Sequence, residues 1–346
     1  MAGFKPWHGF VLVLCLVLAG AGAWLWAVGH GSFEIPLAEL EARYSLPQSK
    51  FMDVDGIRVH YVDEGSGPAV VLLHASYMSL HTWNELAQAL RDDYRVIRLD
   101  LLNNGLTGPD PSGQYSMERN VQLVEGITQA LGVPAFSLLG TSSGAIVAFE
   151  YAGQHPDQVT RLLLVNAAGL PRTAVNDPLR RRGSALEQWI HRHYLSEAYW
   201  REQLEAQFSS GVEPPAELVR RVYDMNRRQG QREGGMAFVR NFKSRTVEPQ
   251  DLLAAVRAPT LVMWGLGNIQ LSALEADVFE HWLVNAPSAV RKYPKVGHYM
   301  YLEAPDEFGV EVRRFLAGEF DGDLRQTRRI VPGTDGEPTS LTGEPA

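Results

Sequence analysis

The chain has 346 residues, of which 45% are hydrophobic and 21% are charged, so it is long enough to fold as one large α/β domain with a sizeable core. The formal net charge of −8, without a dominant basic patch, argues against a nucleic-acid-binding protein. The single cysteine, Cys15, lies in an N-terminal apolar run. The folded part therefore has no disulfide, no cysteine nucleophile and no zinc knuckle.

Residues 9–29 form an almost unbroken apolar stretch, with Lys5 before it and acidic residues after it from Glu34 on. About twenty apolar residues are enough to span a bilayer, and this charge distribution favours an N-terminus in the cytoplasm. The sequence therefore predicts a transmembrane signal anchor over residues 1–30, which would place the catalytic domain on the periplasmic or extracytoplasmic side. A cleaved signal peptide is the alternative, because small residues near Ala21 fit a cleavage site.

The next part of the chain alternates short apolar strands with helical patterns. Residues 51–63 indicate two strands around an Asp55–Gly56 turn, a strong hairpin signal. Further strands are predicted at 69–73, 94–99, 135–139, 159–165, 260–264 and 289–293, and helices at 82–91, 117–131, 144–154 and 306–316. Alternation at this spacing predicts an α/β fold with a doubly wound, mainly parallel sheet.

Two segments depart from that alternation. Residues 171–256 are rich in charged and aromatic side chains at helical spacing, and they predict a helical cap inserted into a domain that spans residues 31–317. The run Arg180–Arg182 within the cap reads as a solvated helix face. Residues 318–346 are rich in Gly, Pro, Thr and charged residues, which predicts a disordered tail.

The strongest functional signal is a G-x-S-x-G motif with Ser142 at its centre. Gly140 and Gly144 flank the serine, with a buried strand before the motif and a helix after it, which is the context of a nucleophile elbow. So tight a turn requires small flanking residues, and it places the serine hydroxyl at the positive end of the helix. The motif predicts a nucleophile, although an ordinary loop serine is the alternative.

A serine hydroxyl needs a base to remove its proton. His298 follows the last predicted strand, which would bring it to the same edge of the sheet, and it is the candidate base. His74 ends an earlier strand and is expected to fix the loop after it. The backbone N–H groups of Ser76 and Ser143 are predicted to form an oxyanion hole.

Taken together, the loop that opens at His74, the strand end at Asp100, the elbow, and Val296-Gly297-His298 resemble the α/β-hydrolase fold. The resemblance covers roughly residues 51–317, and it is most similar to the capped branch of esterases, meta-cleavage-product hydrolases and haloalkane dehalogenases, including membrane-anchored members. It implies the chain order serine, acid, histidine. Dehalogenation is disfavoured, because it needs a carboxylate nucleophile and position 142 is a serine.

The acid is where this sequence departs from the family pattern. The carboxylate of W-G-x-x-D after the seventh strand is replaced by Asn268, and the alternative acid position holds Asn166. We expect Asn268 to orient the ring of His298, as an asparagine does in papain-like enzymes. Asp277 and Glu275 are alternative acids, but they lie on a helical pattern.

Three functions are consistent with these residues. The first is a serine hydrolase that acts on an ester or related small acyl substrate; the others are a non-catalytic hydrolase-fold binding protein and C–C hydrolase or lyase chemistry in the same pocket. The aromatic residues of the cap would line that pocket or form the cap's own core: Trp189, Tyr194, Trp200, Phe208 and Phe238. The sequence has no metal-ligand spacing, phosphate loop or cofactor fingerprint, so we expect neither a metal nor a cofactor.

Overall fold

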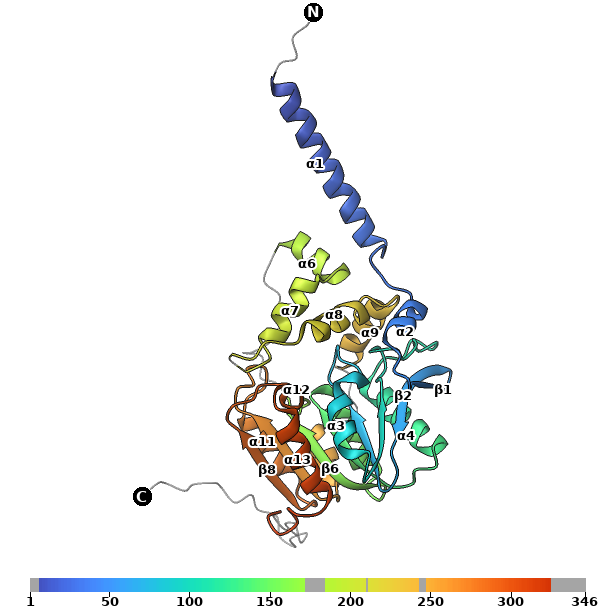
Figure 1. The fold of residues 1–346 in the computed structure, drawn as a ribbon, viewed down its shortest axis with the longest axis vertical. Helices are drawn as coiled ribbons and strands as arrows, with labels where there is room; N and C mark the ends of the chain where they lie inside the picture. The colour runs from blue at the N-terminus through green and yellow to red at the C-terminus, as the bar shows by residue number, and fades with distance from the viewer. Residues whose placement is uncertain (1–5, 172–183, 210, 243–246, 325–346) are drawn as a thin grey trace, which may run out of the picture.

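The computed structural model describes residues 6–171, 184–209, 211–242 and 247–324 (Figure 1). The run Arg180–Arg182 and residues 325–346 of the predicted tail lie outside these ranges.

The domain begins with a hairpin of the predicted strands. Strand β1 (Lys50–Val54) pairs antiparallel with β2 (Ile57–Glu64), and Val54 faces Ile57 across the turn. Asp55 and Gly56 both have a positive φ, of 50° and 81°. This is the backbone twist that a two-residue turn needs to match the twist of its strands, and it explains the aspartate–glycine pair.

Within the described residues the strands form one sheet in the order β1-β2-β4-β3-β5-β6-β7-β8. The six strands from β3 to β8 run parallel to one another, so their carboxyl ends share one edge, and β2 pairs antiparallel with β4. Their bounds are β3 Ala69–Leu73, β4 Arg95–Leu99, β5 Phe136–Thr141, β6 Val159–Val165, β7 Thr260–Gly265 and β8 Ser288–Tyr293. The predicted doubly wound, mainly parallel sheet is confirmed.

Helices cover both faces of this sheet (Figure 1). On one face α5 (Ser143–Gln154) packs against α4 (Met117–Ala130) and α10 (Pro249–Ala255), and α10 contacts α11 (Leu274–Trp282). On the other face the 3-10 turn η1 (Leu80–Trp83) and α3 (Asn84–Leu90) lie with α12 (Met300–Glu303) and α13 (Pro305–Leu316). Each face buries its own apolar cluster, as a sheet covered by helices on both faces requires.

Helices also fill the segment between β6 and β7, where a cap was predicted. These are α6 (Ala185–His193), α7 (Glu197–Glu205), α8 (Ala216–Met225), α9 (Gln231–Phe242) and α10. Ser184 and Ser196 cap the first two, because each hydroxyl accepts a hydrogen bond from a backbone N–H of the first turn. In Figure 1 the helices α6 to α9 lie between the sheet and the N-terminal helix, so the cap occupies that end of the domain.

The N-terminal helix α1 (Pro6–Gly29) projects away from the domain (Figure 1). It contains the one helix segment in the described ranges, Phe10–Gly29, that is long and apolar enough to cross a membrane. Its 24 residues span about 36 Å, and only 6% of the apolar window is buried. The last turn of α1 contacts α6, and a short helix, α2 (Leu37–Tyr44), connects it to the sheet.

At the other end of the chain the domain continues past α13. Phe320 and Leu324 are 1% and 5% exposed, and both belong to the apolar cluster beside α13. Asp321 receives two hydrogen bonds from the guanidinium of Arg161 on β6. The domain therefore extends at least to Leu324, seven residues beyond the boundary at 317 that composition predicted. Composition alone missed this, because Phe320 and Leu324 are isolated apolar residues within a mostly polar stretch.

Candidate functional site

Ser142 lies at the junction between β5 and α5, in a backbone conformation that side chains rarely adopt. Its φ is 52° and its ψ is −118°. A residue other than glycine costs on the order of 1–3 kcal/mol in such a region, and it stays there only when its surroundings enforce it. Here the N–H of Ser142 donates to Val165 O at 3.0 Å, and the carbonyl of Ser142 accepts from Ala145 and Ala168.

The glycines of the motif make this turn possible. A Cβ atom on Gly140 would lie 2.4 Å from the carbonyl oxygen of Gly144. One on Gly144 would lie 2.4 Å from His74 O and 2.5 Å from Leu73 O, at the end of β3. Both contacts involve backbone, which cannot move aside as a flexible side chain can, so only glycine fits at either position.

His298 lies in the loop after β8, and its backbone is held from two sides. Its N–H donates to the carbonyl of Gln207 in the cap at 2.8 Å. Its carbonyl accepts from the side-chain amide of Asn166, at 2.9 Å, and the same amide reaches Gly297 O at 3.1 Å. The side chain of His298 is 1% exposed and lies edge-on to the ring of Tyr299.

Asn166, which occupies the alternative acid position, is therefore a structural clamp. Its amide nitrogen holds two carbonyls of the His298 loop, and its oxygen accepts from Gly265 N at 2.9 Å, at the end of β7. A carboxylate would place a negative oxygen against those two carbonyls. An amide, which both donates and accepts, is the group that this position needs.

Asn268 lies in the loop after β7, which packs directly against the His298 loop. Gly267 N donates to Val296 O at 2.9 Å, and a Cβ on Gly265 would lie 2.3 Å from the carbonyl oxygen of Gly297. The oxygen Oδ1 of Asn268 accepts from the N–H groups of Gln270 and Leu271. Its Nδ2 is buried and has no hydrogen-bond partner within the described residues.

The alternative acids are occupied elsewhere. Asp277 lies on α11, as its pattern predicted, and its side chain is 53% exposed and pairs with Lys292 of β8 at 2.8 Å. Glu275 begins the same helix and accepts a hydrogen bond from Ser272 N. Sheet edge and loop packing therefore bring Ser142, His298 and Asn268 to the same region of the fold, whereas both alternative acids belong to a surface helix.

In the predicted oxyanion hole the hydroxyl of Ser143 lies where an oxyanion would bind. Ser76 N donates to the hydroxyl of Ser143 at 2.7 Å, and Ser76 Oγ donates to the same atom at 2.8 Å. The N–H of Ser143 is in the first turn of α5, where the helix offers no partner. The two predicted residues do lie side by side, but the Ser143 side chain must rotate away before the Ser76 N–H can bind an oxyanion directly.

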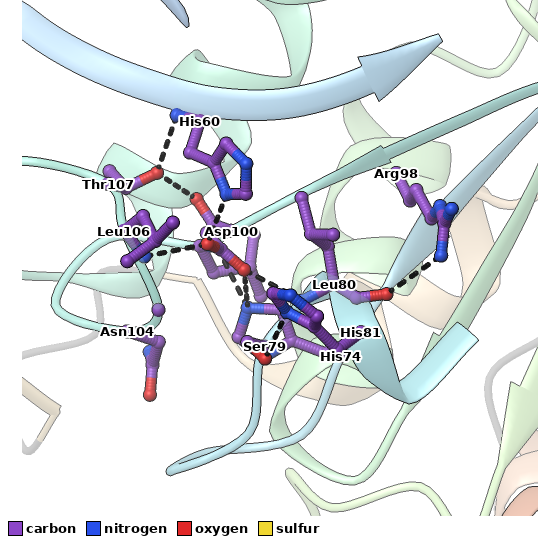
Figure 2. A network of polar contacts seen from close by, with 12 residues as sticks. His60, His74, Ser79, Leu80, His81, Arg98, Asp100, Asn104, Leu106 and Thr107 are labelled. Atoms are coloured by element: carbon purple, nitrogen blue, oxygen red, sulfur yellow. Dashed lines mark hydrogen bonds and ion pairs between the residues drawn. The ribbon is translucent and has the colours of Figure 1, made fainter. Parts of the chain in front are cut away.

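Beside this edge, Asp100 is the centre of a buried polar network. Figure 2 shows its carboxylate between the ring of His60 and the backbone N–H groups of Leu80 and Leu106, each at 2.7 Å. Burial alone would raise the pKa of Asp100, but the contact with His60 and the nearby His74 outweigh it and hold the pKa well below its usual range. Asp100 is thus an ionised structural group.

His74 belongs to this network and has the role predicted for it. Its Nε2 accepts from Leu101 N at 2.9 Å, which places the proton on Nδ1, 2.7 Å from Ala75 O. Burial lowers the pKa of His74, so the ring is neutral. It joins the loops after β3 and β4.

Glu303 on α12 links the cap to the loop after β8 that carries His298, which we call the base loop. Its carboxylate accepts from Gly297 N at 3.0 Å and from Ser209 N of the cap at 2.8 Å. Neither this link nor the clamp by Asn166 was predicted. Both act through backbone groups, which leave no side-chain pattern in the sequence.

A cavity of about 550 Å³ lies under the cap, lined by the end of α1, by α6, α7 and α9, by the loop after α8, and by Tyr77 and Asn103 from the loops after β3 and β4. Of the aromatic cap residues, Tyr194 and Trp200 line it, Trp189 lines a neighbouring groove beside α1, and Phe208 packs against Tyr299. Phe238 packs at the edge of the core. The lining does not include Ser142 or His298, as far as the described residues define it.

The described residues contain no group of three or more histidine, cysteine or acidic side chains placed to hold a metal ion. A half-buried serine on a strained turn, with the imidazole of His298 on a loop at the same sheet edge, is an arrangement suited to nucleophilic catalysis.

Comparison with known proteins agrees with this architecture. A family model described as "alpha/beta hydrolase fold" matches residues 68–305. A cis-3-alkyl-4-alkyloxetan-2-one decarboxylase of Shewanella oneidensis is 26% identical over 289 residues, which cover 77% of this chain and 87% of that protein.

Two solved structures show the same fold. A membrane phospholipase A, described as a bacterial virulence factor, is 24% identical with a TM-score of 0.65, covering 90% of this chain and 98% of that one. A meta-cleavage product hydrolase from Pseudomonas fluorescens has a TM-score of 0.66 and covers 78% of this chain and 98% of its own. The predicted resemblance to hydrolases of the meta-cleavage type is confirmed at the level of fold.

Proposed function

The chain belongs to the α/β-hydrolase fold family, and we propose that it is a serine hydrolase that acts on an ester or related small acyl substrate through Ser142 and His298. The observation that carries the proposal is the backbone of Ser142, held at φ 52° and ψ −118° by close packing of Gly140 and Gly144. A fold that maintains this conformation gains an accessible hydroxyl at a helix N-terminus.

The proposed reaction has two halves. His298 removes the proton of the Ser142 hydroxyl as the oxygen attacks the acyl carbon, and the oxyanion binds the N–H of Ser143 and, after the Ser143 side chain turns, that of Ser76. His298 returns the proton to the leaving alcohol, which leaves an acyl-enzyme. Water then attacks the acyl carbon, gives a proton to His298, and the acid departs as Ser142 regains its hydrogen.

The amide at position 268 is proposed to orient His298 without supplying a negative charge. In a serine protease the corresponding aspartate-to-asparagine change costs about 10⁴ in turnover, because the amide can hold the wrong imidazole tautomer. We therefore expect slow turnover. The related decarboxylase is named for an oxetan-2-one, a cyclic ester, so a relative of this chain already accepts a strained acyl carbonyl.

The test compares the full-length protein with its Ser142→Ala variant in a non-ionic detergent. Turnover of short-chain nitrophenyl esters and covalent labelling by a fluorophosphonate should both disappear in Ser142→Ala. Ser112→Ala, which changes an exposed serine in a turn, is the matched control and should retain both. Equal background turnover and no labelling in any of the proteins would refute the acyl-enzyme and favour a hydrolase-fold binding protein.

We also propose that α1 is a membrane anchor that leaves the hydrolase domain outside the cytoplasm. The support is its apolar surface, with Lys5 before it and acidic residues after it. A protease added to spheroplasts should digest the domain without lysis of the cells. Protection of the domain until lysis would contradict this orientation.

A further inference from the structure

The cavity under the cap has a strongly cationic lining. Its basic wall consists of Arg192, Arg227, Arg228, Arg232, Arg240, His191 and His193, against one acidic residue, Glu34. Arg227 pairs with Asp224, and Arg232 pairs with Glu233. Arg192 and Arg240 are exposed and make no ion pair with another described residue. The cavity therefore carries more positive charge than its own carboxylates neutralise.

Arg228 is the most informative member of this wall. Arg228 is 3% exposed, and among the described residues its guanidinium donates only to the carbonyls of Gly105 and Thr107. Its Nε is buried without a hydrogen-bond partner in the described part of the chain. Burial lowers the pKa of Arg228 to about 10, while the charge of Asp100 opposes this shift. A buried guanidinium without a carboxylate in contact is costly, and a bound anion would offset that cost.

The cavity also holds unsatisfied acceptors. Asn103 and Gln231 are each 8% exposed. Their side-chain oxygens, Oδ1 and Oε1, are buried and have no hydrogen-bond partner among the described residues. A suitable ligand would present anionic oxygens to the arginines and a hydroxyl donor to these amides. Arginine binds phosphate in a planar, two-bond geometry, so a phosphate ester that carries a hydroxyl fits this set.

The remaining wall is apolar and lies against the end of α1. It is formed by Val28, Phe33, Tyr194, Leu195, Trp200 and Met236. The ring of Tyr194 contacts both Phe33 and Trp24, which joins the cavity to the last turns of the helix. A neighbouring groove is lined by Leu25, Trp26, Leu186 and Trp189 of α1 and α6, and His193 lines both spaces. The cationic cavity thus opens beside the apolar helix.

We propose that this cavity binds the phosphate headgroup of an acyl ester drawn from the membrane that α1 enters. The substrate class of the hydrolase is then a phosphate-bearing, hydroxylated amphiphile, such as an acylglycerol phosphate. The reaction rests on the proposed function above, whereas binding does not depend on it. Tyr77 lines the cavity and directly follows Ser76 at the proposed oxyanion hole, so the ester of a ligand held here would lie towards the elbow.

Binding is measured with full-length Ser142→Ala protein in a non-ionic detergent, so that no turnover occurs. The probes are a 1-acylglycerol 3-phosphate, the neutral 1-acylglycerol with the same chain, and glycerol 3-phosphate. The phosphate lipid should bind at least tenfold more tightly than either of the others. The added substitutions Arg192→Gln and Arg240→Gln should reduce its preference over the neutral lipid at least fivefold, and because both residues are exposed, the fold should survive.

Arg220→Gln is the matched control, because Arg220 is an exposed cap residue that pairs with Glu197 and does not line the cavity. It should leave all three affinities unchanged. Equal affinity for the charged and neutral lipids would overturn the proposal. So would glycerol 3-phosphate that binds as tightly as the lipid, since the site would then serve a soluble phosphate ester. Selective lipid binding by a wild-type protein that cleaves no ester would refute the hydrolase but keep this assignment.

Discussion

Two amides stand where the family would place a carboxylate, and their surroundings differ. Asn166 uses both ends of its side chain, donating to the His298 loop and accepting from Gly265 N. Asn268 uses only its oxygen, and its Nδ2 is buried without a partner within the described residues. An acid could therefore replace Asn268 at little structural cost, whereas at position 166 it would lose the two hydrogen bonds that the amide donates to the His298 loop.

Asn268→Asp should raise kcat/KM for a nitrophenyl ester at least tenfold, which is about 1.4 kcal/mol of transition-state stabilisation. One carboxylate oxygen would keep the bonds from Gln270 and Leu271, and the other would stabilise the protonated ring of His298. Steady-state kinetics of both proteins measure this. Asn285→Asp, at an exposed asparagine that bonds Ala254 O, is the control. Unchanged kinetics for Asn268→Asp would show that position 268 does not serve the base.

The elbow makes a second prediction at this scale. Gly144→Ala should lower the free energy of unfolding by about 1–3 kcal/mol, because the new methyl group meets two backbone oxygens at 2.4 and 2.5 Å. Gly309→Ala on α13 is the matched control. Its methyl group would meet only Ala89 Cβ at 3.6 Å, so stability should hold or rise slightly. Urea unfolding of the three proteins compares them, and equal stabilities for both variants would contradict the packing argument.

At the scale of elements, the base loop is a junction of three parts of the fold. It bonds to the end of β7, to Asn166 after β6 and to the cap at Gln207. Glu303 closes the junction, because its carboxylate holds Gly297 N and Ser209 N together. The position of His298 therefore depends on how the cap packs against the base loop.

Glu303→Gln should lower kcat for a small nitrophenyl ester about tenfold while KM stays within twofold. In the wild type Oε2 accepts from both N–H groups and Oε1 accepts from Gly297 N as well. In the glutamine the accepting oxygen loses its negative charge and the amide NH₂ takes the place of the other oxygen, so one N–H group meets a donor or a weaker acceptor while the pocket walls remain. A lower kcat with an unchanged KM indicates displacement of the base, whereas loss of substrate binding would raise KM. Glu307→Gln, an exposed neighbour on α13, should change neither parameter. A rise in KM alone would contradict this role.

The sequence predicted those helices and strands whose periodic apolar residues are also the residues buried in the fold. The elbow helix ends at Gln154 and strand β6 spans Val159–Val165, both at the predicted residues. Helix α2 was not predicted, because within Leu37–Tyr44 only Leu40 is buried and no apolar period develops. Its stability comes from partners distant in the sequence, such as Asp224, which accepts from Arg43 and Tyr44.

The places of the candidate site residues in the fold could be predicted from the sequence, but their contacts could not. Ser142, His298 and Asn268 follow strands whose carboxyl ends share an edge, and periodicity alone places them there. Arg228 offered no such signal, because an arginine in a charged helical insertion reads as solvated. Only the burial of its guanidinium against Gly105 and Thr107 shows otherwise.

Across the whole molecule, partly buried polar contacts join the N-terminal segment to the sheet and the cap. Arg43 of α2 pairs with Asp224 of the cap, and His81 of η1 bonds the carbonyl of Tyr44 at 2.7 Å. Burial lowers the pKa of His81 to about 4, with Asp100 opposing the shift. The neutral ring fits these contacts, since Nε2–H donates to Tyr44 while Nδ1 faces the Ser79 hydroxyl at 3.1 Å.

This histidine should make the protein less stable in mild acid. The unfolded chain binds a proton at His81 below about pH 6.5, whereas the native ring stays neutral until about pH 4, so stability is fully present above the first value and falls between the two. His74, whose pKa is also lowered by burial, acts in the same direction. From His81 alone the free energy of unfolding should drop by about 2 kcal/mol between about pH 7 and about pH 5.

Urea unfolding of His81→Gln at both pH values tests this, because glutamine retains a donor for Tyr44 O but does not titrate. The variant should be less stable than wild type near pH 7, and it should lose about 2 kcal/mol less on acidification to about pH 5. His281→Gln, at an exposed histidine on α11, should keep the wild-type dependence. An identical acid loss in His81→Gln and wild type would mean that protonation of another group governs how the N-terminal segment is held to the domain.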